Sequence, residues 1–324
     1  MSLFTSLVLG LFLFVIFNKL WCFWCRSKVC LIGKTALITG GASGIGFQTA
    51  LALASKGCRI IIADITNLNE AVEQIKKISN NPNIIGKHID LRSFDSVRQF
   101  AKEILETEPK LDILLCNAGI GDYRIRTFTQ DGLERTMQVN YFSHFLLTHL
   151  LLDLLKKAPS TRIIFTSSIT AYVSDLTIEN LNPNPDYYHG FLTKMNGGTY
   201  SNSKLCLAAA AKMFAERLKG TGVTVNTVLP GGVQTPIWSA TKRDFNFIGI
   251  FVTCLVYLYG KTPEQGAQTL IHVAHSENVE GQTGQFFYEG MRFLKPLQLS
   301  EGFCKELWHK SIECTKLQAH EIKC

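Results

Sequence analysis

The sequence predicts an α/β fold in which helices cover both faces of a doubly wound parallel sheet. Short apolar runs alternate with stretches of helical pattern from residue 34 onward, and a glycine-rich turn joins the first run to the first helix. The 324 residues, of which 46% are hydrophobic, can bury the core of one large domain or of two small ones. We predict a single domain over residues 33–290, an anchor at 1–25 before it and a tail at 291–324 after it.

The first 25 residues have the composition of a membrane anchor. An uncharged apolar run from Leu3 to Phe17 resumes at residues 20–25, and the whole is about long enough to span a bilayer. Arg26 and Lys28 follow it, which keeps that flank cytoplasmic and argues against a cleaved signal peptide. Because Lys19 interrupts the run, an anchor embedded in one leaflet is the alternative. We therefore expect a membrane location, in the endoplasmic reticulum or on lipid droplets, with the main domain in the cytosol.

Composition excludes several other classes of protein. The net charge of +7 suits an anionic cofactor or an acidic membrane surface, but it is too diffuse for nucleic-acid binding. The ten cysteines lack the spacing of a disulfide framework and are expected to be reduced thiols. The histidines show no metal-ligand spacing, since His144 and His149 lie five residues apart, so we predict no metal site.

The first predicted strand and the turn after it point to a dinucleotide. Residues 34–39 run into Gly40-Gly41-Ala42-Ser43-Gly44-Ile45-Gly46, and a helical pattern covers residues 47–56. Glycines permit a tight turn, and they let backbone N–H groups and a helix N-terminus approach a pyrophosphate. The Gly-x-x-x-Gly-x-Gly spacing is one residue wider than the common fingerprint, and glycines that serve only a turn are the alternative. This setting predicts a Rossmann-type domain.

The second predicted strand, residues 59–63, ends at Asp64. A carboxylate about 20 residues after the glycines can accept hydrogen bonds from the adenosine ribose hydroxyls, and it repels a 2′-phosphate. Ile65, Thr66 and Ser43 offer no positive charge nearby. The sequence therefore predicts NAD as the cofactor in preference to NADP.

Further elements continue the alternation. Helices are predicted at 69–79, 95–106 and 132–157, and strands at 84–89, 111–116 and 162–166. The fourth strand runs into Asn117-Ala118-Gly119, a corner of small residues where a cofactor could lie. Asn140 is a poor helix former inside an apolar helix, for which a satisfied polar bend is the alternative to a site residue. Ser167 and Ser168 end the fifth strand, and one of them is a candidate donor to a substrate oxygen.

A Tyr-x-x-x-Lys sequence lies at the start of the alanine-rich helical run at 205–218. The spacing of Tyr200 and Lys204 puts both side chains on one helical face. A lysine ammonium beside a phenol favours the phenolate and lowers a pKa that is normally about 10. Such a tyrosine can take a proton from an alcohol or return one to a carbonyl. Alone, the pair is a common coincidence.

Together these pieces resemble the short-chain dehydrogenase/reductase superfamily, and within it the membrane-anchored retinol dehydrogenase group. The motifs that carry the resemblance are the glycine turn, Asp90, Asn117-Ala118-Gly119, Asn140, Ser168, Tyr200-x-x-x-Lys204, Pro230-Gly231 and Thr235. The group resemblance rests on residues 145–148, 219–224 and 266–269. Many relatives have an arginine just after the second strand and use NADP. This chain has Asp64 and Ile65 there instead.

The resemblance implies a role for each matching residue. Tyr200 would be the acid/base and Lys204 would hold the nicotinamide ribose, while Ser168 orients the substrate oxygen and Asn140 supports a proton relay. The corner at Pro230 would seat the nicotinamide. The implied cofactor-binding residues are Thr39, Gly40, Ser43, Gly44, Ile45, Gly46, Asp64, Asp90, Leu91, Asn117, Ala118, Gly119, Tyr200, Lys204, Pro230, Gly231, Val233 and Thr235.

The expected substrate is a lipophilic alcohol or carbonyl compound. Residues 236–260, which are apolar and aromatic from 245 to 259, would form a substrate lid. An apolar lid suits a retinoid, sterol or prenol that comes from the bilayer. The alternative is a segment that packs on the domain or on a second subunit of a homo-oligomer. The segment between Ser168 and Tyr200 reads as an exposed loop beside the substrate mouth, and a helix at 262–275, a strand at 283–288 and an amphipathic tail at 300–317 complete the chain. The rival hypothesis is a non-catalytic dinucleotide-binding protein of membranes or lipid droplets.

Overall fold

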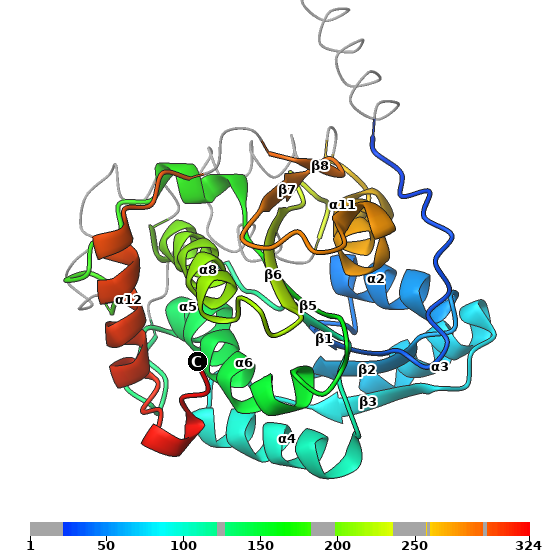
Figure 1. Cartoon of the computed structure of the whole chain (residues 1–324), viewed down its shortest axis with the longest axis horizontal. Coiled ribbons are helices and arrows are strands. Elements are labelled where there is room, and N and C mark those ends of the chain that lie inside the picture. The colour runs from blue at the N-terminus through cyan, green and yellow to red at the C-terminus, as the bar shows by residue number, and fades with distance from the viewer. Residues whose placement is uncertain (1–21, 122–126, 183–197, 236–256, 258–259, 294–296) are drawn as a thin grey trace, which may run out of the picture.

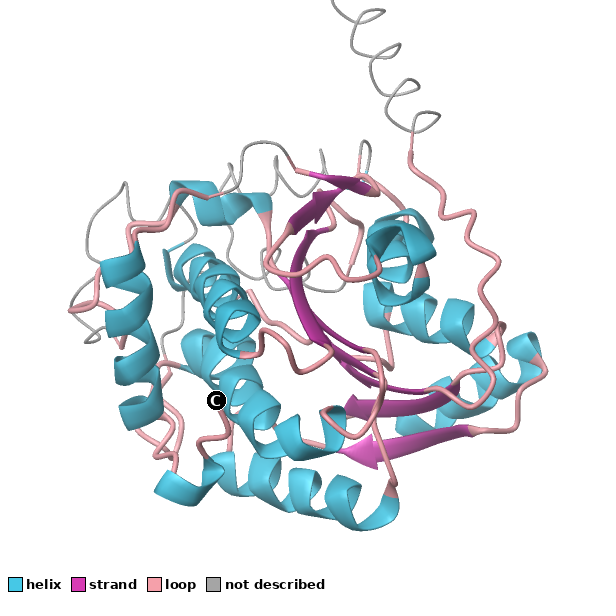
Figure 2. Cartoon of the chain, in the orientation of Figure 1, coloured by secondary structure: helices cyan, strands magenta, loops and turns pink. Residues whose placement is uncertain are grey.

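A parallel sheet with helices on both faces forms the centre of the computed structural model (Figures 1 and 2). The structure describes residues 22–324 except 122–126, 183–197, 236–256, 258–259 and 294–296. In this part of the chain the sheet has eight strands in the order β3-β2-β1-β4-β5-β6-β7-β8. Every neighbouring pair is parallel except β7 and β8, which are antiparallel. The doubly wound α/β prediction is confirmed, with one antiparallel edge strand that it did not contain.

The strands are β1 Thr35–Thr39, β2 Arg59–Asp64, β3 Ile84–His88, β4 Ile113–Cys116, β5 Thr161–Thr166, β6 Val223–Leu229, β7 Phe286–Tyr288 and β8 Met291–Arg292. Strands β1, β4, β5 and β6 are almost entirely buried because helices cover both of their faces. Strand β6 is absent from the sequence-based predictions, although its alternating β-branched residues carried a strand signal.

Two layers of helices enclose the sheet, and they are distinguished by the core that each shares. One face is covered by α2 Gly44–Ala54, α3 Leu68–Ser79 and α11 Pro263–His275. The other face is covered by α4 Phe94–Thr107, α6 Ser143–Leu155 and α8 Gly198–Arg217, with α12 Glu301–Cys314 packed outside α8. Short segments connect them, namely α5 Arg135–Met137, η1 Gln138–Phe142, η2 Ile169–Val173, η5 Glu277–Val279 and η6 Ala319–Glu321.

The strand order reverses direction between β1 and β4, and the space outside the carboxyl ends of these two strands is called the crevice below. The chain moves outward from β1 through β2 to β3, then crosses back to place β4 on the other side of β1. Loops that follow the two central strands therefore diverge at their carboxyl ends, which is where ligands bind in open α/β sheets. The glycine turn follows β1 and the Asn117 corner follows β4, so both predicted cofactor motifs meet at this point.

The long helix predicted over residues 132–157 begins later and is not uniform. Its helical part starts at Arg135, a π-helical segment occupies Gln138–Phe142, and α6 continues to Leu155. A π-helix inserts one extra residue into the helical turn, and it is common at functional sites. Hydrophobic periodicity cannot reveal this change in hydrogen-bond register.

The predicted tail contributes to the main core. Trp308 of α12 is buried, with its ring centroid 4.9 Å from that of Phe145 and 4.7 Å from that of Phe214. Arg217 lies 4.6 Å from the centroid of the Trp308 ring. The boundary at residue 290 stays a prediction, but α12 packs as part of the domain.

Residues 22–30 form an extended segment along the surface of α11. The predicted anchor covers residues 1–25, and its first 21 residues lie outside the described part of the chain, as does nearly all of the predicted lid at 236–260. The searched, described helices include none that is both long and apolar enough to cross a membrane. The cysteines of the described residues are all free thiols.

Candidate active site

Thr39, at the end of β1, is hydrogen-bonded to the corner that follows β4. Its hydroxyl accepts hydrogen bonds from the backbone N–H groups of Asn117 at 2.9 Å and Ala118 at 3.1 Å. On its other side it lies 2.8 Å from His144 Nε2. Thr39 is fully buried, and its hydroxyl holds the corner after β4 in place.

The glycine turn leaves no room for side chains. Gly40 and Gly44 have positive φ angles of 66° and 55°, which favour glycine. A Cβ atom at Gly46 would collide with the Gly40 carbonyl, so only glycine lets α2 begin this close to β1. Ser43 is the exposed N-cap residue, and Ile45 lies in the first turn of α2. The helix therefore presents its N-terminal N–H groups at the crevice, an arrangement that binds phosphates.

Asp64, at the end of β2, holds the glycine turn as well as facing the crevice edge. Its Oδ2 accepts a hydrogen bond from Ala42 N at 3.1 Å, and its Oδ1 accepts one from Ile65 N at 2.8 Å. The carboxylate is only half-buried, so its remaining lone pairs can accept further hydrogen bonds. This geometry is compatible with ribose hydroxyls as partners.

Asp90 and Leu91 follow β3, the strand at the outer end of the sheet beside β2. Arg92 donates to both carboxylate oxygens of Asp90, and this pairing lowers the pKa of the Asp90 carboxyl. Leu91 is buried, and its carbonyl accepts a hydrogen bond of 2.6 Å from Ser143 Oγ. The side chain that would meet an adenine is therefore a carboxylate already held by an arginine.

Asn140 lies in the π-helical segment and joins three parts of the chain. Its Oδ1 accepts from Ile120 N at 2.8 Å, and its Nδ2 donates to Ile120 O and to Ser203 Oγ, both at 3.0 Å. The side chain is fully buried. Asn140 is thus a satisfied polar residue, and it is also fixed beside the turn of α8 that carries Lys204.

His144 extends this network back to the glycine turn, and the sequence predictions assigned it no such role. Its Nδ1 donates to the Asn140 carbonyl at 2.9 Å, which leaves Nε2 to accept the Thr39 hydroxyl proton. Burial lowers the pKa of the His144 imidazole to about 4, so the ring stays neutral. The only signal in the sequence was the spacing of four residues from Asn140 within one helix.

The two serines after β5 have different roles. Ser167 is buried, and its hydroxyl donates to the Lys204 carbonyl at 2.7 Å, which ties the strand end to α8. Ser168 is half-exposed, and its hydroxyl accepts from Thr170 N at 3.2 Å as the N-cap of η2. A hydroxyl that accepts a bond can still donate its own proton. Of the two serines, Ser168 is therefore the one whose hydroxyl proton has no acceptor among the described residues.

Tyr200 and Lys204 lie on the same face of α8, as predicted. The Lys204 ammonium is 5.5 Å from the centroid of the Tyr200 ring. It is 3% exposed and donates one hydrogen bond of 2.8 Å to the Thr166 carbonyl, its one acceptor among the described residues. Desolvation lowers the pKa of the ammonium to about 8. A Cβ atom at Gly119 would lie 3.5 Å from Lys204 Nζ and 3.4 Å from Asn140 Oδ1, so the corner after β4 borders this pair.

The corner after β6 lies across the same edge of the sheet. Pro230 is buried, and Gly231 turns the chain with a φ of 84°. Val233 is buried and forms a parallel bridge with Lys261, and Thr235 is half-buried at the border of the described chain.

The described residues fit a dinucleotide and contain no metal site. Along the carboxyl edge of the sheet, the half-buried Asp64 carboxylate comes first, the glycine turn with the N-terminus of α2 comes next, and the buried Lys204 ammonium lies beyond β4. In the searched, described residues no group of three or more His, Cys, Asp or Glu side chains could hold a metal ion. An alcohol placed between Ser168 and Tyr200 would have a hydrogen-bond donor and a proton acceptor at its oxygen.

Comparison with known proteins supports this interpretation. Residues 34–177 match the family model described as short chain dehydrogenase. The human protein Retinol dehydrogenase 13 is 35% identical over 304 residues, which are 92% of this chain and 89% of that protein. Human Retinol dehydrogenase 14 is 36% identical, over 85% of this chain and 84% of that protein.

Solved structures share the fold. Salutaridine reductase from Papaver somniferum is 26% identical with a TM-score of 0.61, and the match covers 79% of this chain and 99% of that one. A protein from Mycobacterium paratuberculosis, 24% identical, has a TM-score of 0.67 and covers 91% of this chain and 98% of its own.

Proposed function

This chain belongs to the short-chain dehydrogenase family, and on that premise we propose that it is an NAD(P)-dependent oxidoreductase acting on a lipophilic alcohol or its carbonyl product, retinol-like alcohols above all. The observation that carries the proposal is the grouping of Tyr200, Lys204 and Asn140 beside the corner at Gly119. The relatives at 33–36% identity supply the substrate class, since they are retinol dehydrogenases.

The cofactor would lie across the carboxyl edge of the sheet. The turn at residues 40–46 would hold the pyrophosphate, Asp64 the adenosine ribose, Asp90 and Leu91 the adenine, and the corners at 117–119 and 230–235 the nicotinamide half. When bound, the nicotinamide accepts hydride from the alcohol carbon or returns it to the carbonyl carbon.

Proton transfer is assigned to this chain's own residues. In the oxidation direction, deprotonated Tyr200 takes the hydroxyl proton of the alcohol as the carbon–hydrogen bond breaks, and in reduction it returns that proton to the carbonyl oxygen. Ser168 donates a hydrogen bond to the same substrate oxygen and so orients it. The Lys204 ammonium favours the charged phenolate through its positive charge. Asn140 holds the π-helical turn against Ser203 and would anchor a relay that returns protons to solvent.

NAD is the cofactor that the end of β2 favours. The Asp64 carboxylate would repel a 2′-phosphate bound near the end of β2, and exposed Ile65 supplies no cation to offset that repulsion. A cellular preference for oxidation would follow from NAD use.

A membrane setting would suit both the substrate and the N-terminal sequence. The apolar residues 3–17 and the apolar segment at 245–259 would place the substrate entrance close to a bilayer, in the endoplasmic reticulum or on lipid droplets, with the domain in the cytosol.

A substrate and cofactor panel tests the proposal. Full-length protein in detergent is mixed with NAD or NADP and with retinols, steroids or long-chain alcohols, and NADH or NADPH is followed by absorbance. We expect turnover with retinol-like alcohols, and a higher kcat/KM with NAD than with NADP. Dinucleotide binding without turnover of any substrate would instead identify a non-catalytic binding protein.

A further inference from the structure

A lysine outside the predicted catalytic group holds the corner where the nicotinamide would lie. Lys261 precedes Thr262, the N-cap residue of α11, and its backbone forms a short parallel bridge with the chain after β6. Gln234 N donates to the Lys261 carbonyl and Lys261 N donates to the Gly232 carbonyl, both at 2.9 Å. The ends of the segment that contains the predicted lid are therefore joined two residues beyond the Pro230-Gly231 corner.

The Lys261 side chain reaches past this bridge to the corner itself. Its ammonium donates to the Pro230 carbonyl at 3.2 Å, forms an ion pair with Glu289, and lies 5.4 Å from the centroid of the Tyr288 ring. A Cβ atom at Gly231 would lie 3.4 Å from the same nitrogen. Pro230 has no backbone N–H group, and Gly231 has no side chain and a flexible backbone. The Lys261 ammonium therefore supplies a hydrogen bond to the corner that these two residues cannot supply themselves.

Glu289 in turn fixes the lysine to two other parts of the chain. It lies in the two-residue turn between β7 and β8 with a φ of 50°, and Gly290 follows with a φ of 68°. While Oε1 pairs with Lys261, Oε2 accepts a hydrogen bond of 3.3 Å from Phe23 N. The extended segment at residues 22–30, whose first four residues belong to the predicted anchor, is thus bonded to the same carboxylate that holds the corner.

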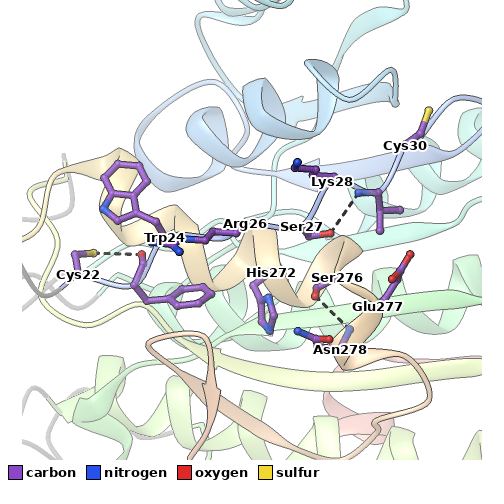
Figure 3. Close-up of a pocket in the computed structure, with 12 residues that line it drawn as sticks. Cys22, Trp24, Arg26, Ser27, Lys28, Cys30, His272, Ser276, Glu277 and Asn278 are labelled. Carbon is purple, nitrogen blue, oxygen red and sulfur yellow. Dashed lines mark hydrogen bonds between the residues drawn. The ribbon is translucent and has the colours of Figure 1, made fainter.

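That extended segment is itself docked firmly on α11. The Phe23 ring packs on Gly290, where a Cβ atom would collide with it, and lies 5.2 Å from the His272 ring centroid. Cys25 N donates to Gln268 Oε1 at 3.1 Å. Figure 3 shows His272 facing this segment beside an open hollow lined by Arg26, Lys28 and the end of α11. This hollow is not lined by any of the proposed catalytic residues.

We propose that Lys261, held by Glu289, is a positioning residue for the dinucleotide. It fixes the Pro230 carbonyl and so the corner that seats the nicotinamide, and through Glu289 it joins that corner to the extended segment at residues 22–30. The inference rests on the proposed function, because it concerns the cofactor of that reaction. Lys261 touches neither Tyr200 nor Lys204 in the described contacts, so its effect is on geometry at the cofactor rather than on proton transfer.

Titration of full-length protein with NADH, followed by the fluorescence of the bound nicotinamide, tests the inference without a substrate. Lys261→Met removes the donor and keeps most of the side-chain volume. We expect it to weaken NADH binding about tenfold, the loss that corresponds to one charge-assisted hydrogen bond. In turnover, the KM for the dinucleotide rises more than kcat falls. Lys261→Arg, which keeps the charge and the donors, recovers most of the affinity.

A control separates positioning from general stabilisation. Arg98 pairs with Glu321 at 3.0 Å in a similarly half-buried ion pair that joins distant parts of the chain away from the crevice. Arg98→Met should lower thermal stability and leave NADH affinity unchanged. A Lys261→Met protein that binds NADH as the wild type does would overturn the inference. If Lys261→Met does not fold, Glu289→Gln decides: weaker NADH binding supports the inference and unchanged binding overturns it.

The two proposals fail in different ways. Wild-type protein that binds NADH but turns over no alcohol overturns the proposed catalysis, and the affinity of Lys261→Met still decides the inference. Wild-type protein that binds no dinucleotide overturns both.

Discussion

Burial of the Lys204 ammonium is costly to the fold and useful to the proposed reaction. The group has one acceptor among the described residues, the Thr166 carbonyl, and it lies beside the Tyr200 ring. A cation in this position can stabilise a phenolate more strongly than it could in water, because the surrounding protein screens it less. The same lack of solvent destabilises the charged form of the folded protein.

Replacing Lys204 with methionine should stabilise the protein at neutral pH while abolishing activity. The pKa of the ammonium falls from 10.5 in the unfolded chain to about 8 in the folded one, so the unfolded state binds the proton more tightly. The cost of the charge is therefore fully present below pH 8 and declines as the pH rises from 8 to 10.5. We expect Lys204→Met to be more stable than the wild type by on the order of 2 kcal/mol at pH 7, and by less at pH 9.5.

Denaturant unfolding at the two pH values measures this difference. Lys310→Met is the matched control, because Lys310 is exposed and its one ion pair among the described residues is with Glu313 on the same helix. It should change stability by less than about 0.5 kcal/mol at either pH. A Lys204→Met protein no more stable than the wild type at pH 7 would contradict the argument.

Removing the Tyr200 hydroxyl tests proton transfer directly. Tyr200→Phe keeps the ring beside Lys204 but leaves no group to exchange the substrate proton. We expect kcat to fall about 10²- to 10⁴-fold while NADH affinity stays within twofold of the wild type, roughly the range for loss of a general acid/base. Turnover by the variant at the wild-type rate would refute the assignment.

The catalytic side chains of the candidate site could be proposed from the sequence, whereas the hydrogen bonds that support them could not. The proposed catalytic side chains were identified because their residue types and their order along the chain are specific. The bonds that hold them, from Ser167 to the Lys204 carbonyl and from His144 to the Asn140 carbonyl, depend on which elements become neighbours. No local pattern reveals such a partner, so these roles required the fold.

At the scale of elements, the end of β2 offers a test of cofactor choice that does not disturb the glycine turn. Asp64 cannot be replaced cleanly, because its carboxylate also accepts the Ala42 N–H. Ile65 is 40% exposed beside it, and an arginine there would meet a 2′-phosphate. We expect Ile65→Arg to raise the ratio of kcat/KM for NADP to that for NAD about tenfold, the effect of one charge-assisted contact.

Steady-state kinetics with both dinucleotides measure that ratio. Ile78→Arg, on an exposed position of α3, adds the same charge away from the turn and should leave the ratio unchanged. If wild-type protein already prefers NADP, or if Ile65→Arg leaves the ratio unaltered, the reasoning about the end of β2 is wrong.

Elements were predicted well where hydrophobic periodicity decides them and poorly where hydrogen-bond register does. Strands β1 to β5 lie within two residues of the predicted ranges, because each is a short apolar run between turns. The π-helical segment at Gln138–Phe142 was missed, since one inserted residue hardly changes the apolar pattern. The edge strand β8 was missed because two residues carry no periodicity at all.

At the scale of the whole molecule, residues 22–30 are part of the domain surface, including the last four residues of the predicted anchor. Residues 22–30 are hydrogen-bonded to α11 and to the turn between β7 and β8. Glu289 in that turn also holds Lys261, which bonds the Pro230 carbonyl. Figure 1 shows this segment entering on the side of the molecule where β7 and β8 lie. A membrane anchor before residue 22 would therefore be joined directly to this fixed segment.

The positive charges after the apolar run predict which side of a membrane the domain faces. With Arg26 and Lys28 at the cytoplasmic flank of the apolar run, the whole domain should face the cytosol, and protease added to intact microsomes should digest it. A lumenal marker protein, protected until detergent is added, controls for intact vesicles. Deleting residues 1–21 should release an active protein from the membrane fraction, because the contacts of residues 22–30 remain. Protection of the domain in intact microsomes would place it in the lumen and reverse the predicted orientation.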